Sequence, residues 1–116
     1  MVIEIAHFRL SPGKSEAFFD ALDKAAVLLR AAQGYRGHTA GHGVETPHIA
    51  TLIVAWRSHA DHVEHFEPSA AHDQFLGMLE GFHEGDIDVF HVEAEFPRNI
   101  MQLPGFREHG RDRDSP

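Results

Sequence analysis

The sequence predicts an α+β domain of the ferredoxin-like kind, with the order strand, helix, strand, strand, helix, strand and an antiparallel sheet. Three observations support this fold class. The 116 residues are enough for one modest hydrophobic core but not for two. Two stretches carry apolar side chains at helical spacing, and four stretches are rich in β-branched and aromatic residues. Glycine and proline mark the breaks between them, as expected of short connections.

The first half of the chain contains a strand, a helix and a second strand. Residues 2–10 read VIEIAHFRL and stop at a Ser-Pro-Gly turn signal, which predicts the first strand. Residues 15–33 repeat apolar side chains every three or four positions and stop before Gly34, which predicts an amphipathic helix. Residues 35–44 contain three glycines, so we expect a bent or bulged strand.

The most apolar segment, residues 48–56, reads HIATLIVAW and predicts a central strand that is covered on both faces. A four-stranded sheet with helices on one side leaves its other side exposed. Such an apolar strand would then present a patch that is too large for a monomer. We therefore expect a homodimer in which two sheets cover each other.

A second helix and a last strand complete the pattern. Ser58 followed by Asp61 is typical of a helix N-terminus. Pro68 should break this helix, and Ser69 should cap its continuation. Residues 87–96 alternate well enough to form the last strand. Its members expected on one face are Phe90, Val92, Ala94 and Phe96.

The expected domain covers residues 1–97, and residues 98–116 form a C-terminal extension and flexible tail. The first part of the extension still holds apolar residues that could pack on a partner subunit. These are Ile100, Met101, Leu103 and Phe106. The final ten residues are polar, which is typical of a loose tail.

Composition and charge exclude several classes of partner. Eighteen acidic and ten basic residues give a formal charge of −8, which opposes phosphate backbones and anionic lipid surfaces, so we expect no nucleic acid and no membrane. No apolar run reaches the roughly 18 to 20 residues of a spanning helix, and the expected location is the cytoplasm. The chain has no cysteine, which excludes disulfides and thiolate chemistry.

The eleven histidines raise the question of a metal site. His59, His62 and His65 are three residues apart, but no His-Glu-x-x-His helical zinc motif occurs. The sequence also has no phosphate-binding glycine loop, no Gly-x-Ser-x-Gly elbow and no dinucleotide fingerprint. We therefore expect neither a metal nor a cofactor.

Several segments resemble one known family. They are residues 8–14 (FRLSPGK), residues 34–37 (GYRG) and, above all, residues 52–58 (LIVAWRS). The matching positions of the following helix are His62, His65, Phe66, Ser69 and Phe75. Over roughly residues 2–96 the chain resembles the antibiotic biosynthesis monooxygenases. The resemblance implies a homodimeric α+β barrel, with a small apolar pocket between helices and sheet in each subunit.

The resemblance also implies a cofactor-free oxygenase that removes a proton from a small phenolic or polyketide-like molecule. His65 falls on a pocket position, and His72 lies seven residues further on, so these two are the expected catalytic bases. A desolvated imidazole keeps a proton-free nitrogen near neutral pH and can accept such a proton. Trp56 and Phe75 are expected to contact the substrate, and Arg36 to offset negative charge.

His38 and His91, on the second and last strands, are further expected substrate-binding residues. Each candidate also has a structural interpretation. A helical histidine can be an exposed surface residue, a strand histidine can be buried and hydrogen-bonded, and Trp56 can be a core residue.

Two related branches offer other activities. The haem-degrading branch carries an asparagine in strand one and a tryptophan and a histidine where this chain has His65 and Phe75, so haem degradation is disfavoured. The cyclase branch resembles the chain at His72 and Phe75 but has a histidine where Glu4 stands. A polyketide cyclase or isomerase, or a non-catalytic small-molecule-binding dimer, therefore stays open beside the oxygenase.

Overall fold

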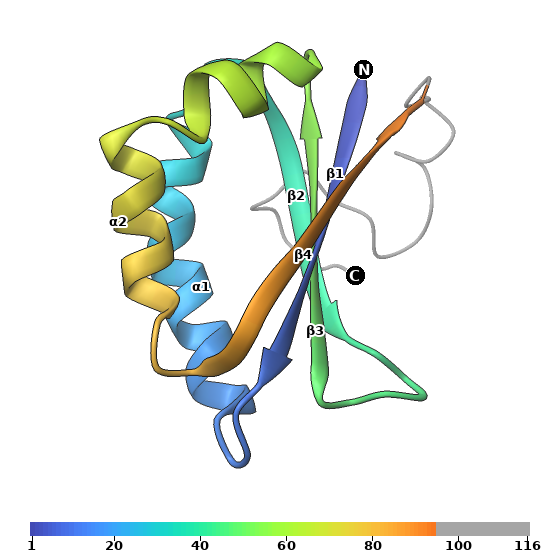
Figure 1. Cartoon of the computed structure of the whole chain (residues 1–116), viewed down its shortest axis with the longest axis vertical. Coiled ribbons are helices and arrows are strands. Elements are labelled where there is room, and N and C mark those ends of the chain that lie inside the picture. Colours follow the sequence, from blue (N-terminus) through green and yellow to red (C-terminus); the bar gives the residue numbers. More distant parts are fainter. Residues whose placement is uncertain (95–116) are drawn as a thin grey trace, which may run out of the picture.

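The computed structural model describes residues 1–94 of the chain. In chain order the elements are β1 (Val2–Leu10), α1 (Ser15–Arg30), β2 (Tyr35–His42), β3 (Ile49–Trp56), η1 (Asp61–Phe66), α2 (Ala70–Leu79) and β4 (His83–Glu93). The strands form one antiparallel sheet in the order β2-β3-β1-β4, and α1 and α2 lie side by side on one face of it (Figure 1). The predicted ferredoxin-like fold is confirmed.

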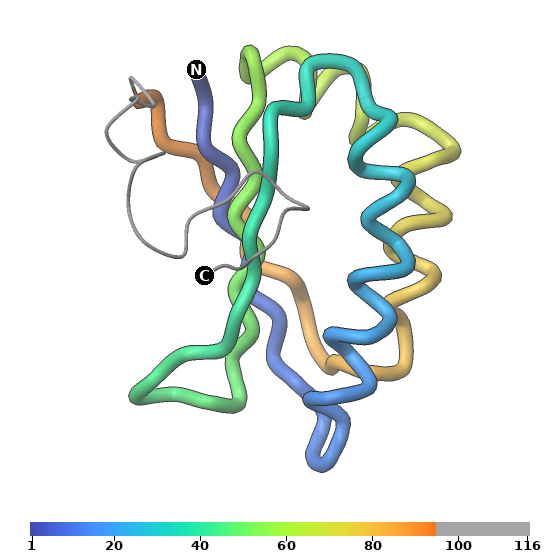
Figure 2. The backbone as a smooth tube through the Cα atoms, turned by 180° about the vertical axis from the view of Figure 1, so that it is seen from behind, coloured from blue at the N-terminus to red at the C-terminus, as the bar shows by residue number. Residues whose placement is uncertain are grey.

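Figure 2 shows the same two layers from behind, with α1 in front of α2. The core fills the space between the layers, because alternate residues of the strands point toward the helices. In β1 these include Ala6 and Phe8, and in β3 they include Leu52 and Val54. The helix α1 contributes the stripe that its sequence spacing predicts, namely Phe18, Leu22, Ala25 and Leu29.

The connection from β3 to α2 contains a wide helical turn, η1. As predicted, Ser58 caps the helical segment that leads into it from residue 59: the hydroxyl accepts the backbone N–H of Asp61 at 3.1 Å and donates to the Asp61 carboxylate at 2.9 Å. The turn is a π-helix, in which the N–H of Glu67 donates to the carbonyl of His62, five residues earlier, at 2.8 Å. No sequence signal predicted this geometry.

Pro68 lies in the turn between η1 and α2, where it ends the first helical segment. Ser69 then caps α2, because its hydroxyl accepts the backbone N–H of His72 at 3.1 Å. The predicted break and restart of the second helix are both confirmed.

Asp61 fastens η1 to the connection between α1 and β2. Its buried carboxylate accepts hydrogen bonds from Arg57 Nε at 2.8 Å and from Gln33 Nε2 at 2.7 Å. These hydrogen bonds hold the pKa of the Asp61 carboxyl well below its usual range. Gly34 has a positive φ of 82° and leaves the space that this carboxylate occupies.

The last strand differs from its prediction at both ends. It begins at His83 rather than at residue 87, because Gly85, with a φ of 74°, lets the strand pass through a register shift opposite His7 and Arg9. The expected last residues, 95 and 96, lie outside the described residues. So do the expected domain boundary at residue 97 and the extension over 98–116.

The sheet face that points away from the helices has an apolar part, beside a polar row in which His7 pairs with Thr51 and Asp88. Ile5 of β1 pairs with Ile53 of β3 and with Phe90 of β4 in adjacent register. Phe90 and Val92 are 47% and 43% exposed, and α1 and α2 both lie on the opposite face of the sheet (Figure 1). None of the helices in this part of the chain is long and apolar enough to cross a membrane.

Candidate functional site

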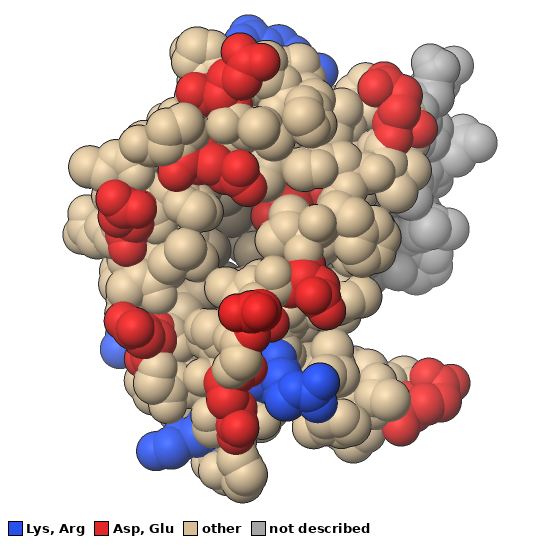
Figure 3. All heavy atoms as spheres, in the orientation of Figure 1, with Lys and Arg blue, Asp and Glu red and all other residues tan. Residues whose placement is uncertain are grey.

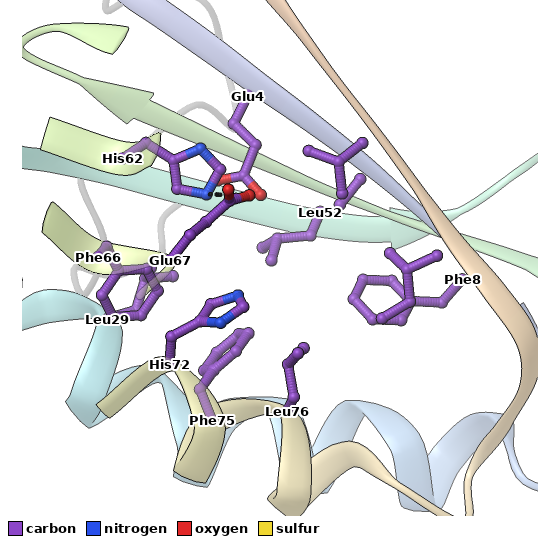
Figure 4. A pocket seen from close by; sticks show the side chains of 13 residues that line it. Glu4, Phe8, Leu29, Leu52, His62, Phe66, Glu67, His72, Phe75 and Leu76 are labelled. Carbon is purple, nitrogen blue, oxygen red and sulfur yellow. Dashed lines mark ion pairs between the residues drawn. The ribbon is translucent and has the colours of Figure 1, made fainter. Parts of the chain in front are cut away.

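A cavity of about 140 Å³ lies between the sheet and the helices. Figure 3 shows a hollow on the face of the molecule that is turned to the viewer in Figure 1, and Figure 4 shows the cavity from close by. Its apolar lining residues are Ala6, Phe8, Leu29, Leu52, Phe66, Phe75, Leu76, Ile87 and Val89. The polar ones are Glu4, His62, Glu67 and His72. An apolar pocket with a few convergent polar groups is the usual form of a small-molecule site.

Glu4 lies on the inward face of β1, in line with Ala6 and Phe8, and is 7% exposed. Its Oε1 atom accepts a hydrogen bond from Trp56 Nε1 at 2.9 Å. Burial raises the pKa of the Glu4 carboxyl to about 7, although the hydrogen bond from Trp56 lowers it. Glu4 can therefore change its protonation state near neutral pH.

His62 is the second partner of the Glu4 carboxyl. Its Nε2 atom lies 3.3 Å from Glu4 Oε1 and 3.6 Å from Glu67 Oε2 (Figure 4). The ring stacks on Trp56 at a centroid distance of 4.9 Å and is 2% exposed. Burial lowers the pKa of His62 to about 4, with smaller contributions from the neighbouring histidines. This imidazole is therefore uncharged at neutral pH.

The π-turn of η1 explains why two polar residues of one short segment reach the same cavity. A hydrogen bond that spans five residues stacks Glu67 over His62, where an α-helix would stack Phe66. Both side chains therefore point toward β1. π-turns inside helices are frequently found at functional sites.

His72 reaches the cavity from the opposite side. It stands in the first turn of α2 and points toward the space in front of Glu4 (Figure 4). Its ring meets Phe66 edge to face at a centroid distance of 5.2 Å, and Phe75 lies one turn further along the helix. The cavity thus has two proton-accepting sides, a carboxyl–imidazole pair on the sheet side and one imidazole on the helix side.

The lining has no cationic side chain from Lys or Arg among the described residues. Nor do His, Asp and Glu side chains of residues 1–94 gather in a group of three that could hold a metal ion. What the arrangement offers is proton transfer in an apolar space, with negative charge balanced by N–H donors only.

Comparison with known proteins shows to which family the chain belongs. The family model of the antibiotic biosynthesis monooxygenases matches residues 1–77. The chain belongs to this family. YczJ, an uncharacterized protein of Bacillus subtilis strain 168, is 30% identical over 93 residues, covering 80% of this chain and 98% of YczJ.

Solved structures agree with the monooxygenase family fold. A Bordetella bronchiseptica protein that bears the same family designation has a TM-score of 0.77 and 25% identity, covering 80% of this chain and 95% of its own. SnoaB, a cofactor-independent oxygenase from Streptomyces nogalater, has a TM-score of 0.67 and 13% identity, covering 84% and 95%. At that identity SnoaB supports the fold alone.

In this member of the monooxygenase family, two residues expected at the pocket lie elsewhere. The His65 side chain is exposed and does not line the cavity, so its expected pocket position is wrong. The reason is the π-turn, which directs His62, Phe66 and Glu67 inward and leaves His65 outside. Arg36 is exposed at the bulge of β2 and does not reach the cavity either.

The other expected residues divide into two groups. His72 and Phe75 line the cavity. Trp56 is fully buried behind Glu4 and holds that carboxyl rather than lining the space. His38 binds the Tyr35 hydroxyl through Nδ1 at 2.6 Å, on β2, away from the cavity. His91 lies against His62, one residue removed from the cavity.

Three polar residues of the cavity were not proposed from the sequence: Glu4, His62 and Glu67. Glu4 had a detectable signal, because it interrupts an otherwise apolar inward set in residues 2–10. A charged residue at such a position needs a partner. His62 was noted only as a position that matches the family, and Glu67 had no signal, since the shared orientation of the two depends on the π-turn.

Proposed function

We propose that this family member is a cofactor-independent monooxygenase that acts on a small, uncharged phenolic or polyketide-like molecule. The supporting observation is the apolar cavity that ends at the buried Glu4–His62 pair, where the pKa of the carboxyl is about 7. A base whose pKa is close to the working pH is the most effective one for abstracting a weakly acidic proton.

In the proposed reaction the base removes a proton from the substrate, and the resulting electron-rich anion reduces dioxygen directly. When a methylene group becomes a carbonyl group, one oxygen atom enters the product and the other leaves as water with both hydrogens. Dioxygen thus accepts all four electrons, and no external reductant is required. The protein needs to supply a base, a dry space and hydrogen bonds to the anion.

We assign the role of base to Glu4, and keep His72, one of the two bases expected from the sequence, as the alternative. Because no Lys or Arg of the described residues lines the cavity, the substrate should enter uncharged. In the preferred assignment, an N–H of His72 donates to the oxygen of the anion while Glu4 holds the abstracted proton. In the alternative, the two roles are exchanged.

The size of the cavity narrows the substrate class. Its volume of about 140 Å³ is close to that of an engineered protein cavity of about 150 Å³ that binds benzene. A single substituted ring, or an open-chain diketone of similar size, is therefore the preferred guest. A three-ring polyketide would require α2 to move away from the sheet.

We also propose that the protein is a homodimer, with a cytoplasmic location. The apolar outer face of the sheet supports the dimer, because Phe90 and Val92 would be removed from water by a second sheet. The cytoplasmic location is the expectation from the sequence and stays a prediction.

The test is a panel of one-ring phenols, 1,3-diketones and three-ring anthrone-like compounds, each followed with and without dioxygen. We expect oxygen consumption with a one-ring compound and at least a hundredfold loss of kcat in Glu4→Gln. His65→Gln is the matched control, because the exposed imidazole does not line the cavity, and it should keep full activity.

Other outcomes decide between the alternatives. Turnover that does not need dioxygen would replace the oxygenase by a cyclase or isomerase that uses the same base. Binding without turnover of any compound would favour a non-catalytic binding dimer. If His72→Gln abolishes turnover and Glu4→Gln does not, the base is His72.

A further inference from the structure

A row of imidazoles continues from the cavity toward the surface. His62 Nε2 lies 3.3 Å from Glu4 Oε1, and the other nitrogen of the same ring, Nδ1, lies 2.8 Å from His91 Nε2. The His91 ring in turn meets His59 at a centroid distance of 4.7 Å. The four residues come from β1, η1, β4 and the start of the helical segment after β3.

Exposure increases outward from His62. Glu4 and His62 are 7% and 2% exposed, His91 is half-buried, and His59 is exposed. One end of the row therefore lines the cavity and the other end meets water. Each of the two inner contacts joins a group that can give a proton to one that can accept it.

We propose that Glu4, His62 and His91 form a proton path between the cavity and solvent, with His59 at its outer end. The role of the path in turnover rests on the proposed function, because the substrate proton enters at Glu4. The existence of the path does not rest on the proposed function, since proton exchange through the row can be measured without a substrate.

The transfer balances atom by atom. The protonated Glu4 carboxyl gives its proton to Nε2 of His62, whose Nδ1–H passes to Nε2 of His91. His91 then releases its Nδ1 proton to His59 or to water. Each ring gains one proton and loses one, so both imidazoles change tautomer and stay uncharged. The reverse sequence returns a proton to Glu4.

The environment favours uncharged rings that exchange protons. The groups that face His62 are Glu4, Glu67, His91, His72 and His59, from every element packed around it. Burial lowers the pKa of both His62 and His91. Two doubly protonated rings would also oppose two N–H groups across the 2.8 Å contact. The pair therefore has one N–H between the rings, and it can belong to either of them.

A path is useful here because the base lies in an apolar cavity. After Glu4 takes a proton from the substrate, the carboxyl stays protonated until that proton leaves. The buried side of the cavity offers His62 as the acceptor nearest to Glu4. A connection to solvent lets the proton leave while the substrate anion reacts, and lets it return for the release of water.

The first test uses the protein without substrate. In histidine-¹⁵N-labelled wild type, we expect the ring nitrogens of His62 to show intermediate shifts at neutral pH, because the two tautomers exchange. In His91→Gln the amide can still hydrogen-bond to His62 but cannot pass a proton on, so one tautomer should become fixed. His65→Gln, on the same turn but exposed, should leave the His62 signals unchanged.

The second test uses a small 1,3-diketone, whose acidic hydrogen is bonded to carbon, under strictly anaerobic conditions in deuterium oxide. Exchange of its acidic hydrogen measures proton transfer without any oxygen chemistry. We expect His91→Gln to slow this exchange at least tenfold, and added free imidazole to restore part of it. A single fixed tautomer at His62 in wild type, or an exchange rate that His91→Gln does not change, overturns the path. Loss of oxygen consumption with normal exchange would instead contradict only the proposed oxygenase.

Discussion

The indole of Trp56 and the carboxyl of Glu4 meet on the inward face of the sheet, with Nε1 and Oε1 2.9 Å apart. The two residues are diagonal neighbours, because Val2 of β1 pairs with Trp56 while Glu4 pairs with Val54. The only tryptophan of the chain thus supplies the hydrogen bond that makes a buried, ionised Glu4 attainable near neutral pH.

Trp56→Phe should move the pH dependence of activity to higher pH. Phenylalanine keeps an aromatic ring but lacks the N–H that lowers the pKa of Glu4, so the carboxyl should ionise later. The lost hydrogen bond should also cost about 1–3 kcal/mol in the free energy of unfolding. The measurements are a pH–rate profile and urea denaturation. Tyr35→Phe removes a hydroxyl that binds His38 and should leave the profile unmoved.

Glu4 and His62 should have opposite effects on the dependence of stability on pH. The pKa of Glu4 is raised from 4.5 to about 7, so the folded chain keeps a proton that the unfolded chain releases, and stability falls as pH rises through this window. The pKa of His62 is lowered from 6.5 to about 4, so the unfolded chain binds the extra proton, and stability rises with pH there.

Single variants should reveal these two slopes by urea denaturation between pH 4 and 7. Relative to wild type, Glu4→Gln should become more stable as pH rises, and His62→Gln less stable. The free energy of unfolding of each variant relative to wild type should change by about 3 kcal/mol over the pH range between the unfolded and folded pKa values of the replaced group, since one pKa unit corresponds to about 1.4 kcal/mol. Parallel curves for wild type and both variants would show that neither group is perturbed as described.

Gly34→Ala should destabilise the fold strongly. An added Cβ would lie 2.3 Å from Asp61 Oδ2, and the φ of 82° is costly for alanine. Gly81→Ala is the matched control, because its φ is 95° but a Cβ there meets nothing within 4 Å. We expect thermal denaturation to show a loss of about 1–2 kcal/mol for Gly81→Ala, the backbone cost alone, and a clearly larger loss for Gly34→Ala. Equal losses would mean that the Asp61 carboxylate moves away freely.

Phe90→Asp should dissociate the proposed dimer. The substitution places a charge on the apolar outer face of the sheet, which a second subunit would have to desolvate. Sedimentation velocity at micromolar concentration should show a dimer for wild type and a monomer for the variant. Val44→Asp, at a side chain that is 90% exposed in the loop after β2, should remain dimeric. A monomeric wild type would remove the dimer altogether.

The sequence predicted most of the fold because most of its signals are local. The bounds of β1 and β3, the stripe of α1 and the caps at Ser58 and Ser69 follow from side-chain alternation, helical spacing and hydroxyl chemistry. The start of β4 was not predicted by the sequence, because Glu84, Gly85 and Asp86 resemble a turn. Pairing with β1 extends the strand through that segment, and pairing is not visible in a local pattern.

The site was less predictable than the fold. His72 and Phe75 were identified from the family resemblance and do line the cavity. His65 was expected to line it too, but the histidine that does so is His62, three residues earlier. Only the five-residue hydrogen bond of η1 decides which of its histidines turns inward. Glu4 was visible as a carboxylate among inward apolar residues, whereas the inward orientation of His62 follows only from the fold of η1.

The wide turn of η1 also bears on how new activities could arise on this scaffold. Adding or deleting one residue between Ser58 and Pro68 would rotate the segment and exchange the side chain presented to Glu4. The same rotation would displace Phe66, which packs in the hydrophobic core, and Asp61, whose carboxylate binds Arg57 and Gln33. New chemistry at this point of the scaffold is therefore expected from substitution at position 62 rather than from insertion.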